Sequence, residues 1–158
     1  MNIKQYLESV DACSEAVEWA GDRTLEQIID ECPRGDWLLW LAQKLDVDIR
    51  ALTLAKGYCA NTVRHLMTDE RSLAAVDAAI AYGKGEITDE ELRAAADAAS
   101  AAYAAYAASA ASAASAAAYA ASAAYFSCAK KANQKQTADI CRQYLREAII
   151  EQFNNQNR

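Results

Sequence analysis

Apolar residues along this chain recur every three or four positions, which is the spacing of amphipathic helices and not the alternation of strands. A first helix is predicted over residues 3–20, because Val10, Cys13 and Val17 repeat on one side and Gly21 follows as a terminator. Later clusters predict further helices from Thr24 to Glu31, from Asp36 onward, from about Asp46 to Leu66, and up to the turn at Gly83–Gly85. Thr24 with Gln27, and Thr88 with Glu91, have the spacing of capping boxes.

An alanine-rich segment over about residues 89–132 follows, with 24 Ala between Ala94 and Ala132. Alanine has the highest helix propensity, so this segment is predicted to be helical despite its low complexity. One unbroken helix over 89–132 would be about 66 Å long, which exceeds the diameter of a compact domain of this size. We therefore expect either a break within it or a central helix that the others surround, with Ala permitting close helix packing.

The composition supports an all-α fold. Only 28 residues are Leu, Ile, Val or Phe, whereas 38 are Ala, and the chain has one Pro and five Gly. A sandwich or barrel needs more turn residues than this. The prediction is a compact multi-helix bundle in which the alanine-rich helix, continuous or broken, packs closely against its neighbours. We expect a single domain over residues 1–153 and a flexible tail over 154–158.

The charge distribution limits the classes of partner. The formal net charge is −6, and no basic run is longer than Lys130–Lys131, so nucleic acid is not an expected partner. The uncharged stretch 98–129 contains no Leu, Ile or Val, so a membrane span is not expected either. The N-terminus lacks the apolar core of a secretory signal, and we expect a cytoplasmic protein.

No catalytic or metal-binding pattern is visible. His65 is the only histidine, and no acidic residue lies within one helical turn upstream of it. The five cysteines, at positions 13, 32, 59, 128 and 141, form no C-x-x-C pair and are expected to be reduced and buried. The prediction is a protein that is not an enzyme and carries no metal or cofactor.

Two groups of polar residues are candidate binding sites. Five acidic residues recur at three- and four-residue spacing and form a continuous stripe along the first predicted helix, opposite its apolar face: Glu8, Asp11, Glu15, Glu18 and Asp22. The stripe is either a docking surface for a basic protein or a solvated face. Four further residues are candidates for lining a small-ligand pocket: Arg34, Asp36, Arg64 and His65. Trp37, Tyr82 and Tyr119 are candidate anchors for a partner if they are exposed, and core residues otherwise.

Two segments carry a resemblance to a known family. They are ACSEAVEW at residues 12–19 and ECPRGDWLLW at residues 31–40, followed by Ala-Ala-Tyr and Ala-Ala-Ser repeats after Glu91. Together they resemble the small all-α immunity proteins of bacterial polymorphic toxin systems, specifically the fifth family of that series, which phages and prophages also encode. The resemblance spans about residues 10–132 and implies a cytoplasmic protein that binds and blocks a toxin.

The sequence thus favours a non-catalytic protein-binding module, an immunity-type inhibitor that neutralises a basic toxin by stoichiometric binding. One alternative is a phage or prophage protein that binds a host defence component or sequesters a small ligand between its helices. Another is a structural helical protein that oligomerises through its Ser/Ala face. Either a monomer or a homodimer is compatible with these hypotheses.

Overall fold

The computed structural model describes residues 1–67, 69–110 and 116–157, and their side chains except for Leu66 and residues 101–130. Every regular element within these residues is a helix, which confirms the predicted all-α fold. In chain order the elements are α1 (Ile3–Ser9), α2 (Ser14–Ala20), α3 (Leu25–Glu31), α4 (Gly35–Lys44), α5 (Ile49–Asn61), the 3-10 helix η1 (Arg64–Leu66), α6 (Glu70–Gly83), α7 (Asp89–Ala110) and α8 (Ala116–Gln156).

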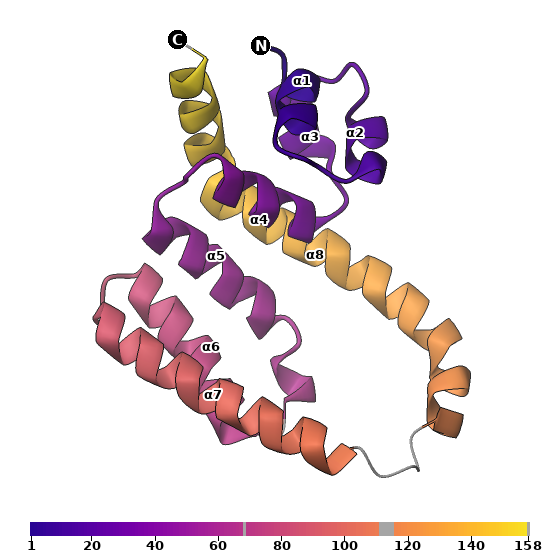
Figure 1. Ribbon diagram of the computed structural model, residues 1–158, viewed down its shortest axis with the longest axis vertical. Coiled ribbons are helices and arrows are strands. Elements are labelled where there is room, and N and C mark those ends of the chain that lie inside the picture. The colour runs from indigo at the N-terminus through magenta and orange to yellow at the C-terminus, as the bar shows by residue number, and fades with distance from the viewer. Residues whose placement is uncertain (68, 111–115, 158) are drawn as a thin grey trace.

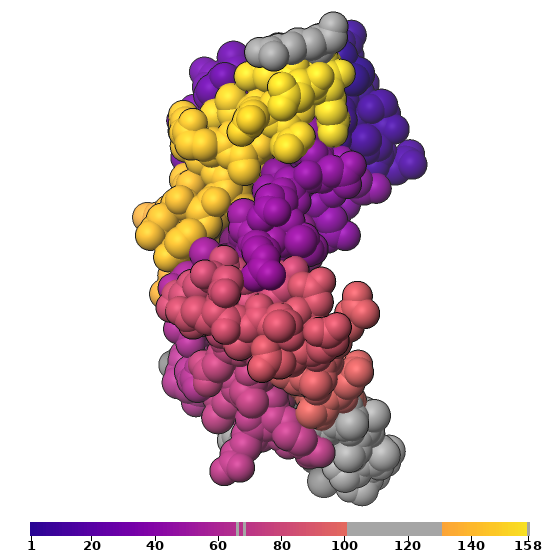
Figure 2. Space-filling view, turned by 90° about the vertical axis from the view of Figure 1, so that its left-hand side faces the viewer, coloured from indigo at the N-terminus to yellow at the C-terminus, as the bar shows by residue number. Residues whose placement is uncertain are grey.

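The helices form an elongated bundle with α8 along one side (Figure 1). Helices α1–α3 and the end of α8 lie at one end of the molecule, together with both termini, and α6 and α7 lie at the other. Helix α8 packs against α3, α4 and α5, and α5 packs against α6, which in turn packs against α7. Figure 2 shows the same order from the side, with the end of α8 in yellow beside the indigo N-terminal helices.

The predicted first helix is two helices, which corrects the expectation of one helix over residues 3–20. Asp11 adopts the left-handed conformation, with φ 57°, and ends α1. The N–H of Ala12 donates to the carbonyl of Leu7 at 3.0 Å, and that of Asp11 to Glu8, the bonding pattern of a Schellman motif. Aspartate tolerates this conformation better than most residues, so a helix end was possible without glycine.

The same device corrects the boundary predicted at Asp46. Asp46, with φ 53°, ends α4 in a second Schellman motif, and Asp48 caps the next helix by accepting from the N–H of Ala51 at 3.0 Å. The predicted helix over 46–66 is shorter, since α5 ends at Asn61. Ile49 lies at the helical spacing of a core residue relative to Leu52, which is buried, but Ile49 itself is 59% exposed.

The capping boxes are confirmed. In each, the side chain of the cap threonine accepts from the backbone N–H three residues later, and the Gln27 or Glu91 side chain accepts from the cap N–H at 2.9 or 2.8 Å. Asp36, by contrast, is not a helix cap. Arg34 occupies the cap position of α4, and Asp36 lies in the first turn of that helix.

The sequence analysis did not predict the helix that supplies much of the core. Along α8, buried residues recur every three or four positions: Ala138, Cys141, Leu145, Ile149 and Phe153. They belong to one buried cluster with Ile29, Leu38 and Leu45. Helix α8 continues through Gln156, whose side-chain amide donates to the carbonyl of Leu45 at 3.3 Å. Residues 154–156 are therefore helical and not the start of a flexible tail.

The alanine-rich segment is divided between α7, which ends at Ala110, and α8, which begins at Ala116. Residues 111–115, and the side chains of 101–130 with the predicted Ser/Ala face, Tyr119 and Cys128, lie outside the described residues. No helix in the described part of the chain combines the length and the apolar character needed to cross a membrane.

Candidate binding pocket

The three tryptophans of the chain line one cavity of about 420 Å³. Trp19 comes from α2, and Trp37 and Trp40 come from α4. The ring centroids of Trp19 and Trp37 are 6.1 Å apart, with the rings tilted by 57°. Buried apolar residues from four helices complete the lining: Leu7, Ala20, Ile28, Leu38 and Leu41. The cavity therefore lies between the three N-terminal helices and α4, with an apolar interior.

Arg34 is the central charged residue of the cavity margin. Its guanidinium donates to Asp36 at 3.1 and 2.5 Å and to Glu15 of α2 at 3.2 Å. The same group lies 4.4 Å from the centroid of the Trp37 ring, a cation–π contact that fixes the ring. Hydrogen bonds from Arg34 hold the pKa of Asp36 below its usual value, so this carboxylate stays ionised well into the acid range.

Cations also lie over the other two tryptophans. The Arg23 guanidinium lies 4.6 Å from the Trp19 ring centroid and pairs with Glu31 at 3.0 Å. Lys44 places its ammonium 5.6 Å from the ring of Trp40. Each aromatic wall of the cavity is thus held by a basic side chain of the chain itself.

The structure brings together parts of the two polar groups that the sequence singled out. Asp11 lines the cavity, and Glu15 reaches its margin through the ion pair with Arg34. Glu8, Glu18 and Asp22 are exposed and form no ion pair with any described residue. Because the helix breaks at Asp11, these carboxylates do not form one helical stripe but are spread over α1, α2 and the following turn.

Only two of the four residues predicted to line a ligand pocket lie at this cavity. Arg34 and Asp36 line the cavity, but Arg64 and His65 do not. Arg64 pairs with Asp77 of α6, and His65 is exposed on η1. The reason is that α5 ends at Asn61 and the chain turns toward α6 there, which separates η1 from the start of α4.

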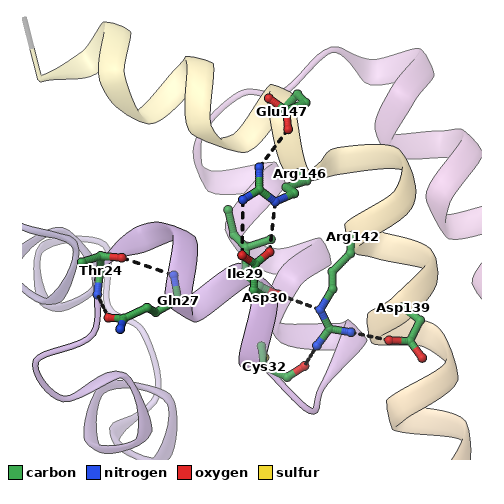
Figure 3. A network of polar contacts seen from close by, with 9 residues as sticks. All are labelled: Thr24, Gln27, Ile29, Asp30, Cys32, Asp139, Arg142, Arg146 and Glu147. Carbon is green, nitrogen blue, oxygen red and sulfur yellow. Dashed lines mark hydrogen bonds and ion pairs between the residues drawn. The ribbon is translucent and has the colours of Figure 1, made fainter.

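Two arginines of α8 bind α3, which is one of the helices that line the cavity, and fix its position (Figure 3). Arg142 donates to the carbonyls of Ile29 at 2.9 Å and Cys32 at 2.5 Å, which satisfies acceptors left free at the end of α3. The Arg146 guanidinium donates two hydrogen bonds to the carboxylate of Asp30, at 3.0 and 3.3 Å. Neither arginine was predicted from the sequence. The two residues lie four positions apart, next to apolar residues at helical spacing, and this pattern could have indicated an amphipathic helix with both arginines on one side.

The expected burial of the cysteines and anchor residues holds only in part. Cys32 and Cys141 are buried, but Cys13 is exposed at the cavity margin. Burial raises the pKa of Cys32, so its thiol stays protonated. Among the candidate anchors, Tyr82 is buried in the core and Trp37 is half-buried in the cavity wall.

A cavity with an apolar interior and a charged margin is suited to binding a group that is apolar at one end and cationic at the other. The interior would bury the apolar part, and the carboxylates at the margin would attract the cation. Within the described residues, no three His, Cys, Asp or Glu side chains are grouped so that they would hold a metal ion. Comparison with protein-family models, with curated proteins and with solved structures finds no match to this chain.

Proposed function

We propose that the chain is a non-catalytic binding module. It binds a basic protein at the cavity lined by Trp19, Trp37 and Trp40, here called the tryptophan cavity. The observation that carries this proposal is the position of a 420 Å³ apolar cavity inside the most acidic part of the molecule. Residues 1–31 contain eight acidic and two basic residues. An apolar side chain of the partner enters the cavity, and basic side chains around it face the carboxylates.

Each part of this surface has a separate physical role. Burial of an apolar anchor between Trp19, Trp37 and Trp40 supplies affinity, as aromatic pockets do at binding hot spots. The exposed carboxylates of Glu8, Glu18 and Asp22 have no ion pair among the described residues, so their charge is available to accelerate encounter with a basic partner.

In biological terms, the proposed module is an immunity-type inhibitor that acts in the cytoplasm and neutralises a toxin by one-to-one binding. Support for the toxin as partner comes from the sequence resemblance in residues 12–19 and 31–40, which here form α2, the end of α3 and the start of α4 around the cavity. A phage-encoded protein that binds a basic defence component would use the same surface.

The test begins with affinity capture from the native host, followed by purification of the captured protein and titration calorimetry. The double charge reversal Glu15→Lys with Glu18→Lys is expected to weaken binding about tenfold or more, mainly through slower association. The matched control is Glu86→Lys with Glu90→Lys, two exposed residues near the start of α7 that change the net charge by the same amount.

The proposal requires one-to-one binding. The reversal of Glu15 and Glu18 should weaken this binding, and the control reversal should leave the dissociation constant within about twofold. Equal loss in both variants would show that only net charge matters, and unchanged binding in both would place the interface elsewhere. Circular dichroism on each variant separates loss of binding from loss of fold.

The cavity volume also favours a second candidate, sequestration of a small apolar or cationic ligand, because 420 Å³ lies in the range of small-molecule sites. Native mass spectrometry of protein purified from its host distinguishes the two. A bound molecule released on denaturation, whose rebinding quenches tryptophan fluorescence, favours the ligand, and a ligand-free chain that still captures a basic protein favours the inhibitor.

A further inference from the structure

Two cysteines far apart in the sequence face each other across the contact of α5 with α8. The sulfur atoms of Cys59 and Cys141 are 3.9 Å apart, although 82 positions separate the residues. The Cys59 sulfur also lies 3.7 Å from the carbonyl oxygen of Thr137, and the Cys141 sulfur lies 3.5 Å from that of Gly35. Both thiols are therefore held at one point, where α4, α5 and α8 meet.

The separation is close to what a disulfide needs. A disulfide bond is about 2.05 Å long, so the sulfurs have to approach by roughly 2 Å. Each sulfur is one rotatable bond from the backbone, and a change in χ1 of either residue moves it by a distance of this order. A side-chain rotation is therefore of the size that the remaining approach of the two sulfurs requires.

The two thiols differ in their access to solvent. Cys59 is half-buried and lines a surface groove of about 360 Å³, together with Asp36, Asn133 and Thr137. Cys141 is 1% exposed and lies behind it in the core. A small oxidant in the groove therefore meets Cys59 first, and Cys141 is the nearest thiol behind it.

The electrostatics of the pair assign different roles to its members. The hydrogen-bonding contact between the two sulfurs lowers the pKa of the Cys59 thiol, which favours its thiolate. The pKa of Cys141 is raised by the same contact and by burial, so it stays protonated until Cys59 has reacted. An accessible thiolate backed by a protonated thiol is the arrangement of an attacking and a resolving cysteine.

We propose that Cys59 and Cys141 form a redox-active pair that a hydroperoxide converts to a disulfide. The Cys59 thiolate attacks one oxygen of the peroxide, the O–O bond breaks, and Cys59 becomes a sulfenic acid while hydroxide leaves. The Cys141 sulfur then attacks the Cys59 sulfur, loses its proton and displaces hydroxide. Each sulfur loses one electron to the peroxide. With hydrogen peroxide, the two hydroxides that leave take up the proton released when the Cys59 thiolate forms and the proton lost by Cys141, so the products are one disulfide and two water molecules.

The groove beside Cys59 shares Arg34 and Asp36 with the tryptophan cavity, but neither Cys59 nor Cys141 lines that cavity. The redox proposal does not depend on the proposed binding function. The disulfide would tie α5 to α8 covalently and close a long loop that contains α6 and α7. Such a cross-link restricts the unfolded chain, so the oxidised protein is expected to melt at a higher temperature than the reduced protein.

The test treats the reduced full-length protein with hydrogen peroxide, blocks the remaining thiols, and maps non-reduced peptides by mass spectrometry. The expected result is a Cys59–Cys141 cross-link with the loss of two hydrogens, reversed by a dithiol. In the variant Cys141→Ala, the expected product is a sulfenic acid on Cys59 that the reagent dimedone traps. The variant Cys13→Ser is the matched control and retains the cross-link.

Because the cross-link is mapped in the unmodified chain, the test does not depend on the folding of a variant. Failure of Cys59 and Cys141 to cross-link under peroxide overturns the proposal, as does a disulfide that joins either of them to a different cysteine. Cys32 is one such competitor, since it is also buried; its sulfur lies 3.3 Å from the carbonyl oxygen of Arg34.

Discussion

The two ends of the bundle are packed by different means. At the end formed by α1–α3, large aromatic side chains meet across a cavity, and arginines bridge the helices. At the other end, α5 and α6 approach so closely that glycine occupies the contact. A Cβ atom added to Gly83 would lie 2.7 Å from Cα of Leu54, and one added to Gly57 would lie 3.1 Å from the backbone nitrogen of Ile80.

This difference shows which end of the molecule has room for a ligand. Close backbone contact leaves no room for a second molecule, whereas the tilted tryptophan rings of the N-terminal end line an open volume. The α5–α6 contact thus serves stability, and the N-terminal end gives up some packing to keep a cavity with a charged margin. Three substitutions, each with a comparison variant, and one change of pH test this contrast.

The largest effect is expected from Gly83→Ala. In a helix this change normally stabilises by up to about 1 kcal/mol, but here the new methyl group meets the backbone of Leu54. We expect a loss of about 3 kcal/mol in the free energy of unfolding, measured by urea denaturation. The control Ala74→Gly, on the exposed side of α6, should cost only about 1 kcal/mol. A gain in stability from Gly83→Ala would contradict the close contact.

The next largest effect is expected at the N-terminal end, from Arg142→Ala. This change leaves the carbonyls of Ile29 and Cys32 without their donor and should cost about 2 kcal/mol. Native-state hydrogen exchange should speed up in α1–α3 before it does in α5 and α6. Arg146→Ala removes a more exposed ion pair and should destabilise the protein less than Arg142→Ala does. Uniform acceleration across the chain would argue against separate ends.

A third test fills the cavity. Ala16 lines it, so Ala16→Leu is expected to change the free energy of unfolding by less than about 1 kcal/mol and to abolish partner binding. The same substitution at Ala55, which is fully buried in α5, should cost about 1 to 3 kcal/mol by overpacking. Equal costs at the two positions would mean that the cavity is not open to an added side chain.

The smallest effect concerns acid. The pKa values of Asp30 and Asp36 are lowered by hydrogen bonds from Arg146 and Arg34, respectively. A lowered carboxyl pKa contributes stability that is present above the unfolded value of about 3.9 and is lost as the pH falls through the folded value. The urea concentration at the unfolding midpoint should therefore decrease when the pH is lowered below about 4, whereas between pH 5 and 7 the contribution of these groups is complete and does not change with pH. Asp30→Asn should reduce the acid-dependent part, and an unchanged profile would show that the pair contributes nothing.

Local sequence signals predicted the helices well where the signal was a cap or a glycine. The capping boxes at Thr24 and Thr88 and the turn at Gly85 lie where the sequence indicated, because these depend on neighbours within a few residues. Asp11 and Asp46 were read as helical because aspartate has no fixed preference for the left-handed conformation. Only the packing on either side of them decided that the helices end there.

The candidate site was predictable in its residue types but not in its grouping. The sequence singled out Asp11, Glu15, Arg34 and Asp36, yet assigned them to two separate sites, and it placed Arg64 with Arg34. Whether two charged residues lie close together depends on where the helices between them end. When a helix ends a few residues earlier, the next segment of the chain runs in a different direction, and its side chains reach different neighbours.

The sequence by itself determined that this protein is helical and that its negative charge lies toward the N-terminus, because propensity and charge are properties of each residue and its near neighbours. The tertiary structure alone decided that three tryptophans enclose a cavity, that α8 clamps α3, and that Cys59 faces Cys141. These features join residues that are distant along the chain, and such contacts arise only when the complete set of helices packs.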